Sequence, residues 1–237
     1  MQEEAACFER KKSAAVLVDL VKAFEQVTLG PVWREGIRTQ FHPRMLRLAL
    51  ELCAVSRRLV YKRAMSRSTA NTLTAILAGL GVASDLMLLK LMKPVDTVIE
   101  KFPALNVYVI ADDVKLGLHD EDEERLSRTM EAATHELIRL TEEDEHMQVS
   151  RGKGGKTVAL GSTRVLRQKL GRKLAIKGIK VKEEVSNLGV GFALHKKGKR
   201  SLMQTKRWHV ARGRKDRIRR LGGRGGQGSQ RRASHRP

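Results

Sequence analysis

Three aspartates in the first half of the chain have neighbours that suit metal-assisted chemistry. Asp19 comes near the end of the short apolar run AAVLVDL, and Asp112 and Asp113 stand together after the run NVYVIA. Adjacent carboxylates repel each other, and a bound cation offsets that repulsion. Mg²⁺ takes oxygen ligands of this kind and keeps water or substrate phosphate in its coordination shell. Asp19, Asp112 and Asp113 are therefore candidate ligands for a pair of Mg²⁺ ions, with Mn²⁺ as the alternative cofactor.

A pair of metal ions held by carboxylates can catalyse phosphoryl transfer. Two ions about 3.5–4 Å apart stabilise both the attacking and the leaving oxygen of an in-line displacement. One ion would activate a 3′-hydroxyl, and the other would hold a triphosphate and neutralise the leaving group. This chemistry requires the element that carries Asp19 to lie beside the element that carries Asp112 and Asp113. The alternative, a pair of aspartates that closes an exposed turn without metal, stays open from these residues alone.

The elements that must position these residues follow from the apolar patterns. Residues 14–20 are expected to form a buried strand and residues 106–118 a hairpin around the Asp pair. Residues 43–58 read as a helix with Leu46, Leu50 and Cys53 on one face and with Leu48, Leu52 and Val55 beside that face. Further helices are expected after the glycines of residues 72–92 and over residues 121–143, and two short strands over residues 173–190. This order favours an α+β fold over strict βαβ alternation.

Basic residues are concentrated at the C-terminal end. The chain has 237 residues and a formal charge of +21, and residues 195–237 hold sixteen Lys and Arg against one acid, Asp216. Such an excess favours a polyanionic partner, above all nucleic acid. We expect a flexible N-terminus (1–13), one folded domain (14–194) and a largely disordered basic tail (195–237). The predicted nucleic-acid-binding residues of the tail are Lys206, Arg207, Arg212, Arg214, Arg219, Arg220 and Arg224.

Other features of the sequence bear on compartment and partners. Cys7 and Cys53 provide neither a disulfide framework nor a zinc-ligand set. No apolar run reaches the roughly 18 residues that a membrane span needs, and the N-terminus lacks the apolar core of a signal peptide. We expect an intracellular protein without a membrane partner, and the nucleus is one compartment that would fit. The sequence does not indicate an oligomeric state.

The sequence around the aspartates resembles reverse transcriptases of the non-LTR retroelement type. Their first catalytic motif is an Asp followed by Lys-Ala-Phe and an acid, as in Asp19-Leu-Val-Lys-Ala-Phe-Glu, where Glu25 replaces the more frequent Asp. Their second is aromatic-x-Asp-Asp, which Ile110-Ala-Asp-Asp matches except at its first position. The resemblance implies a polymerase palm, an antiparallel sheet with helices packed on one face. It implies an RNA-directed DNA polymerase that uses an RNA template, a DNA primer and deoxynucleoside triphosphates, with Asp19 and Asp112 as principal metal ligands.

Further positions match the family more loosely. Phe24 stands where an aromatic residue packs under the incoming sugar, although a core phenylalanine is the alternative. Residues 74–79 resemble a loop that supports the template and the incoming base, with Gly79 allowing close backbone approach or, alternatively, capping a helix. Lys156, in Gly155-Lys-Thr-Val, matches a lysine near the pyrophosphate leaving group, where a proton donor helps catalysis. Residues 186–190 (SNLGV) resemble the primer-grip strand.

The resemblance also shows a departure from the family. Relatives place a fingers region before the first catalytic Asp, and here 18 residues precede Asp19. We therefore expect a fragment, a decayed retroelement copy or part of a split gene product.

Two other functions are consistent with parts of the sequence. Residues 150–157 (SRGKGGKT) resemble a phosphate-binding P-loop, but Ser150 occupies the position of the first glycine and no apolar strand precedes it. The chain could also bind nucleic acid through its basic tail without catalysis.

Overall fold

The computed structural model describes residues 11–58, 60–62, 64–69, 74–77, 79–187 and 190–193. Its contacts divide these residues into two units, the first of which ends at Glu183 while the second begins at Glu184. The strands of the first unit are β1 (Lys12–Val18), β2 (Val60–Tyr61), β3 (Ala64–Met65), β4 (Asn106–Ile110), β5 (Asp113–Asp120), β6 (Val158–Gly161) and β7 (Lys180–Lys182). Its α-helices are α2 (Ala23–Gln26), α3 (Leu29–Arg38), α4 (Pro43–Ala54), α5 (Ala83–Lys101), α6 (Glu123–Arg139) and α7 (Arg164–Leu174), with a π-helical turn η1 (Leu140–Asp144) and a 3-10 turn η2 (Ala175–Lys177). In the second unit, β8 (Glu184–Asn187) pairs with β9 (Val190–Ala193) in an antiparallel hairpin.

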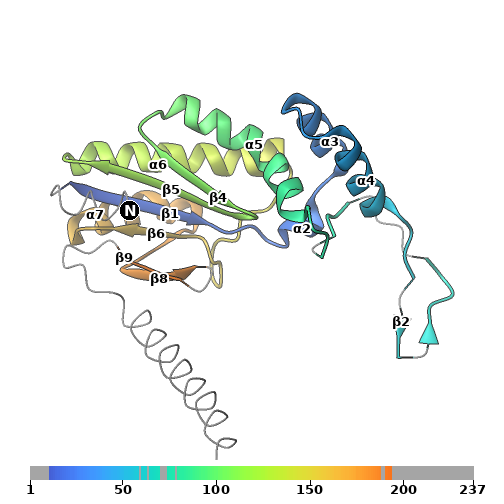
Figure 1. Ribbon diagram of the computed structural model, residues 1–237. Coiled ribbons are helices and arrows are strands. Elements are labelled where there is room, and N and C mark those ends of the chain that lie inside the picture. Colours follow the sequence, from blue (N-terminus) through green and yellow to red (C-terminus); the bar gives the residue numbers. More distant parts are fainter. Residues whose placement is uncertain are drawn as a thin grey trace, which may run out of the picture. The chain divides into compact units, whose positions relative to one another are not determined.

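A five-stranded sheet in the order β4-β5-β1-β6-β7 organises the first unit (Figure 1). The β4–β5, β5–β1 and β1–β6 pairs are antiparallel. The expected mixed α and β architecture is confirmed, but the sheet is not wholly antiparallel, because β6 and β7 run parallel. Parallel neighbours need a crossover connection, and α7 with η2 supplies it.

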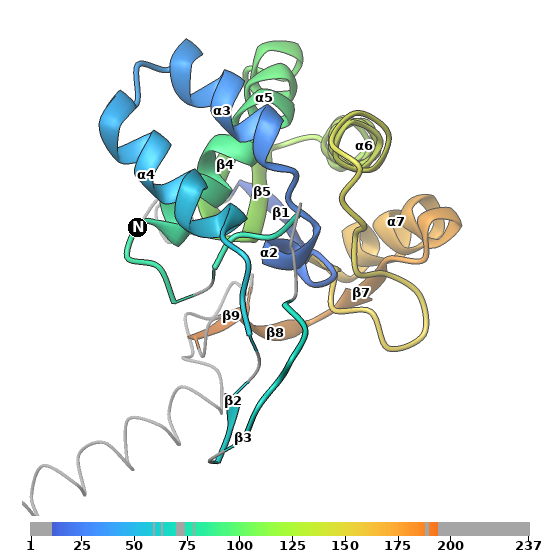
Figure 2. The ribbon, with the colours of Figure 1, turned by 90° about the vertical axis from the view of Figure 1, so that its right-hand side faces the viewer.

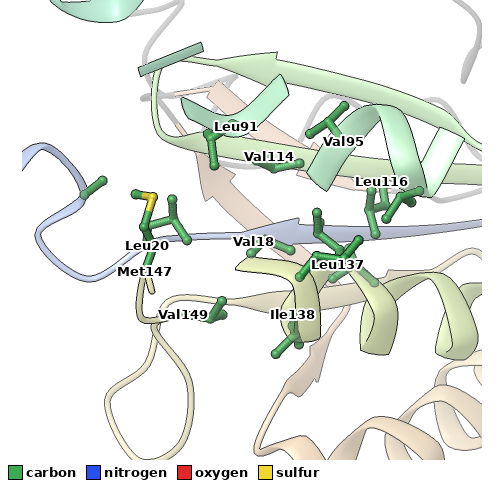
Figure 3. Close-up of a cluster of buried hydrophobic side chains, with 14 of the residues drawn as sticks. Val18, Leu20, Leu91, Val95, Val114, Leu116, Leu137, Ile138, Met147 and Val149 are labelled. Carbon is green, nitrogen blue, oxygen red and sulfur yellow. The ribbon is translucent and has the colours of Figure 1, made fainter. Parts of the chain in front are cut away.

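Side chains alternate along the strands, so the sheet has one face that packs against helices and one opposite face. Val16 and Val18 of β1 and Val114 and Leu116 of β5 belong to the main hydrophobic cluster, and these residues pair across the two strands. Figure 3 shows Leu91 and Val95 of α5 over this face, with Leu137 and Ile138 of α6 beside Val18. Successive side chains of a strand point to opposite faces, so the residues between these positions lie on the face away from the helices.

The opposite face has polar and basic residues on β4, β5 and β7 and buried apolar residues on β1 and β6. From one edge to the other, the strand pairing aligns Tyr108, Lys115, Leu17, Val158 and Lys180. Tyr108 is 45% exposed, and the Lys115 Nζ lies 5.6 Å from the centre of its ring. This face therefore presents an aromatic ring and one ammonium group on β4 and β5 and a second ammonium group on the edge strand β7.

Local sequence explains where the main helices begin. Pro43 stands at the start of α4, where its missing N–H costs no hydrogen bond, and His42 Nδ1 accepts a hydrogen bond from the Met45 N–H at 3.4 Å. The Asp122 carboxylate accepts a hydrogen bond from the Glu124 N–H at 2.8 Å at the start of α6. Thr163 Oγ1 accepts one from the Leu166 N–H at 3.0 Å at the start of α7.

Helix α4 differs from its prediction in length and in its apolar faces. It ends at Ala54, four residues earlier than expected. Leu46, Leu50 and Cys53 are buried as predicted. Leu48, Leu52 and Val55 were expected beside them but are exposed. The apolar surface of α4 is wider than the contact that α3 and the rest of the core provide.

Parts of the predicted organisation lie elsewhere in the chain or outside the described residues. Residues 173–177, predicted as strand, form the end of α7 and the turn η2, and the strands of that region are β7 and β8. The tail residues Lys206, Arg207, Arg212, Arg214, Arg219, Arg220 and Arg224 lie outside the described part of the chain. Strand β1 begins at Lys12, inside the predicted flexible N-terminus.

Candidate active site

Asp19 follows directly after the central strand of the sheet. Strand β1 lies between β5 and β6 and ends at Val18, and Leu20 forms a bridge with Val149 and belongs to the core. Since Val18 and Leu20 both face the helices, Asp19 faces the other way. Its side chain is 22% exposed, so the carboxylate is reachable from solvent but largely surrounded by protein.

The Asp pair lies at the same end of the sheet as Asp19. Ile110 of β4 pairs with Asp113 of β5, so Ala111 and Asp112 form a two-residue turn between the strands. In the pairing of β1 with β5, Val18 lies opposite Val114. One step further along this register, Asp19 lies opposite Asp113. The neighbouring elements that the metal hypothesis required are therefore neighbours in the structure.

The turn that carries Asp112 has an unfavourable backbone conformation. Ala111 has a φ of 54°, in the left-handed region that costs a residue with a Cβ about 1–2 kcal/mol. Backbone strain of this kind is frequent at functional sites, where the surrounding structure holds the residue in place. Here the flanking β4–β5 pairing supplies that constraint.

Lys156 reaches the Asp19 carboxylate from the loop before β6. The Lys156 Nζ lies 3.6 Å from Asp19 Oδ1, and the lysine side chain is 78% exposed. The loop is fixed to the end of β1 by the backbone of Asp19, whose N–H donates to Thr157 Oγ1 at 3.2 Å and whose carbonyl accepts from the Ser150 N–H at 2.8 Å. The structure thus brings together Asp19 and Lys156, which sequence reasoning had linked only through the family resemblance.

Ser150 and Thr157 were not predicted to position the site. Thr157 is buried, and its N–H also donates to the Ser150 carbonyl at 2.9 Å. The signal that would have identified Thr157 is a hydroxyl residue directly before the buried run VALG, where a polar side chain needs a hydrogen-bonding partner.

The carboxylates do not form a complete metal site in their present side-chain positions. Among the described residues, no group of three or more His, Cys, Asp or Glu side chains is arranged to hold a metal ion. The Asp19 carboxylate is engaged by Lys156 instead. The donor chemistry still suits Mg²⁺, because Asp19, Asp112 and Asp113 offer carboxylate oxygens at one end of the sheet.

Phe24 and the segment of residues 74–77 lie side by side. The Ile76 N–H donates to the Phe24 carbonyl at 2.7 Å, and the Ala75 N–H donates to the Val27 carbonyl at 2.9 Å. The Phe24 ring is half-buried and packs against the hydrophobic core. Gly79 has no neighbouring atom within 4 Å of the position that a Cβ would take, so no close backbone approach is found there.

The P-loop alternative is not consistent with the structure of residues 150–157. A P-loop leads into a helix and directs its backbone N–H groups at phosphates, whereas this loop leads into strand β6. The N–H groups of Gly155 and Thr157 donate to carbonyls of Gly152 and Ser150, and the Lys156 N–H donates to Ser150 Oγ.

Comparison with known proteins does not place the chain in a family. No protein-family model matches the sequence, and no curated protein matches it significantly. None of the helices in the described residues has both the length and the apolarity needed to cross a bilayer.

Proposed function

We propose that the chain contains the palm of an RNA-directed DNA polymerase of the reverse transcriptase type. The observation that supports this most directly is the position of Asp19 beside the Asp112–Asp113 turn, at the end of the two central strands, with Lys156 3.6 Å from Asp19. The predicted reaction adds a deoxynucleotide to a primer 3′ end on an RNA template and releases pyrophosphate.

The carboxylates at the end of β1 and in the β4–β5 turn are the proposed metal ligands. When bound, Mg²⁺ would supply Lewis-acid activation of the primer hydroxyl and charge neutralisation at the triphosphate. Asp19 and Asp112 would hold it, with Asp113 as the neighbouring carboxylate. Binding requires Lys156 to move away from Asp19, and its high exposure leaves room for that movement.

Lys156 is the proposed proton donor to the leaving group. Its ammonium is already directed to the carboxylate end of the sheet by the anchored loop. An ammonium released from Asp19 would remain beside the site where negative charge develops on the departing phosphate. Phe24, close to the same end of β1, is the proposed residue under the incoming sugar.

The face of the sheet that carries Asp19 supports a nucleic-acid partner. Tyr108 offers a ring on which a base can stack, and Lys115, Lys180 and Lys182 can neutralise backbone phosphates. Lys180 and Lys182 are exposed, and neither forms an ion pair with another of the residues that the structure describes. An RNA template and a DNA primer would contact these exposed positions on β4, β5 and β7.

Primer extension tests the proposal. Wild-type chain is incubated with an RNA template, a DNA primer, deoxynucleotides and Mg²⁺, beside the double variant Asp112→Asn, Asp113→Asn. A matched control, Glu143→Gln with Asp144→Asn, removes the same two charges from an exposed pair of acids on η1. Extension by wild type and control but not by the site variant supports the proposal, and equal extension by all three refutes it.

Nucleic-acid binding without catalysis is the second candidate function. The engagement of Asp19 by Lys156 and the absence of a three-carboxylate group among the described residues favour it. In that case none of the three proteins extends the primer, while all three bind single-stranded RNA with an affinity that falls as salt rises.

A further inference from the structure

A small cavity lies on the helical side of the first unit, between α3, α5 and the end of η1. Its volume is about 90 Å³, and its lining includes Arg34, Glu35, Lys90, Lys93 and Glu145. Figure 2 shows α3 alongside α5 in this region. The cavity is separate from the carboxylate end of the sheet, and none of its residues belongs to the candidate active site.

Lys90 is the buried cation of this cavity. Its side chain is 1% exposed, and its Nζ donates to Glu145 Oε2 at 2.5 Å. An ammonium has three N–H donors, and the structure gives this one a single protein acceptor. A buried charged donor without a partner is costly, so the cavity must supply oxygen atoms to the remaining N–H groups.

The charges that line the cavity leave an excess of cations. The Glu145 carboxylate is paired with Lys90, and the Glu35 carboxylate is paired with Arg38, which lies outside the cavity. Arg34 and Lys93 are exposed and form no ion pair within the described part of the chain. Lys90 and Glu145 cancel each other's charge, so Arg34 and Lys93 are the two cations of the lining that no carboxylate of the described residues pairs with.

We propose that this cavity binds a phosphate group, either as free phosphate or as the terminal phosphate of a nucleotide. The volume accommodates one tetrahedral oxyanion in place of several waters, but it does not accommodate a nucleoside. Lys90 would donate from the base of the cavity, and Arg34 and Lys93 would donate from its mouth. Phosphate suits this mixed lining, because inorganic hydrogen phosphate keeps a proton at neutral pH that it can donate to Glu35 or Glu145. The terminal phosphate of a nucleotide keeps one in its singly protonated form, whose pKa is about 6. Sulfate has no proton, so it can form no hydrogen bond to the oxygens of these carboxylates.

The experiment is a titration of the full chain followed by amide chemical shifts, in chloride buffer at constant ionic strength. Inorganic phosphate, adenosine monophosphate and sulfate are the three probes. We expect saturable shifts at residues 31–35 and 89–93 with phosphate, and binding of sulfate weaker by about fivefold or more. Comparable shifts with adenosine monophosphate would identify a nucleotide as a second source of the phosphate, and binding of inorganic phosphate alone would restrict the site to the free ion.

Two double variants test whether phosphate binds in the cavity or is attracted to the basic protein in general. Arg34→Gln with Lys93→Gln should weaken phosphate binding at these residues by about tenfold or more. Arg172→Gln with Lys153→Gln removes the same charge from an exposed arginine and an exposed lysine elsewhere and should change it by less than about twofold. Equal weakening in both variants, shifts spread over all basic residues, or sulfate binding as tight as phosphate would overturn the proposal.

Discussion

The buried ion pair between Lys90 and Glu145 makes a quantitative prediction about stability. The side chains are 1% and 9% exposed, so removing one partner leaves a charge in a region of low dielectric. Breaking a pair in such a position costs about 3–5 kcal/mol. Because a domain has about 5–15 kcal/mol of unfolding free energy in total, we expect Lys90→Met to bring the first unit close to unfolding at 37 °C.

Replacing both partners gives a different result. Lys90→Met with Glu145→Leu removes both charges and both desolvation penalties, and its stability should lie within about 1 kcal/mol of wild type or above it. The double variant is therefore expected to be more stable than Lys90→Met alone. If Lys90→Met were destabilised by a lost contact and not by an unpaired buried charge, the double variant would instead be the least stable protein of the series.

Urea denaturation measures these differences. Unfolding free energies are obtained by linear extrapolation at neutral pH, in a buffer free of phosphate so that the cavity beside Lys90 stays without that anion. Arg47→Met is the control, because Arg47 and Glu51 form an exposed pair at 2.7 Å that water screens, so the unfolding free energy of the variant should stay close to that of wild type. A loss below about 1 kcal/mol for Lys90→Met would refute the reasoning.

Other predictions concern packing, the anchored loop and pH. Gly36→Ala would place a methyl group 2.5 Å from Cδ2 of the buried Leu46, and the overlap should cost about 1–3 kcal/mol, of which the higher helix propensity of alanine offsets about 1 kcal/mol. The melting temperature should therefore fall, and a rise would contradict the close packing of α3 on α4. Thr157→Val leaves the Asp19 N–H without its hydroxyl acceptor. The variant should lower the unfolding free energy by about 1–3 kcal/mol and increase amide exchange in residues 150–157. Unchanged exchange would argue that this hydrogen bond does not hold the loop to the end of β1. The Arg125 guanidinium lowers the pKa of Asp120 to about 2, so Asp120→Asn should cost about 1 kcal/mol at pH 7. Because the folded pKa lies below the unfolded value of 3.8, this difference should shrink as pH falls from about 4 to about 2, and a difference independent of pH would exclude the ion pair as its source.

The sequence predicts the elements that have a strong local pattern. The strand β1, the β4–β5 hairpin and the helices α4, α5 and α6 follow from apolar runs and periodicity, and the structure contains all of them. Helix α3 was missed because Gly30, Pro31 and Gly36 lower its helix propensity. Strand β6 was missed because VALG is only four residues long, and its burial depends on pairing with β1.

The candidate site was predictable only where its residues stand beside elements with a strong local pattern. The Asp19 and Asp112–Asp113 positions stand beside recognisable strands, whereas the approach of Lys156 to Asp19 depends on a loop 137 residues later in the chain. The buried role of Lys90 had no signal either, because a lysine within an apolar helix has the same sequence pattern whether or not a distant Glu145 pairs with it.

The central position of β1 has a consequence for the order in which the protein folds. Residues 12–18 form an apolar strand that is synthesised before both of its neighbours, residues 113–120 and 158–161. Pairings between such distant segments form slowly because loop closure must precede them. The strand therefore has both edges unpaired until residues 113–120 have left the ribosome, and one edge unpaired until β6 follows. Chaperones that bind extended apolar segments would meet this protein at residues 12–18, and mutations that weaken β6 would prolong that exposure.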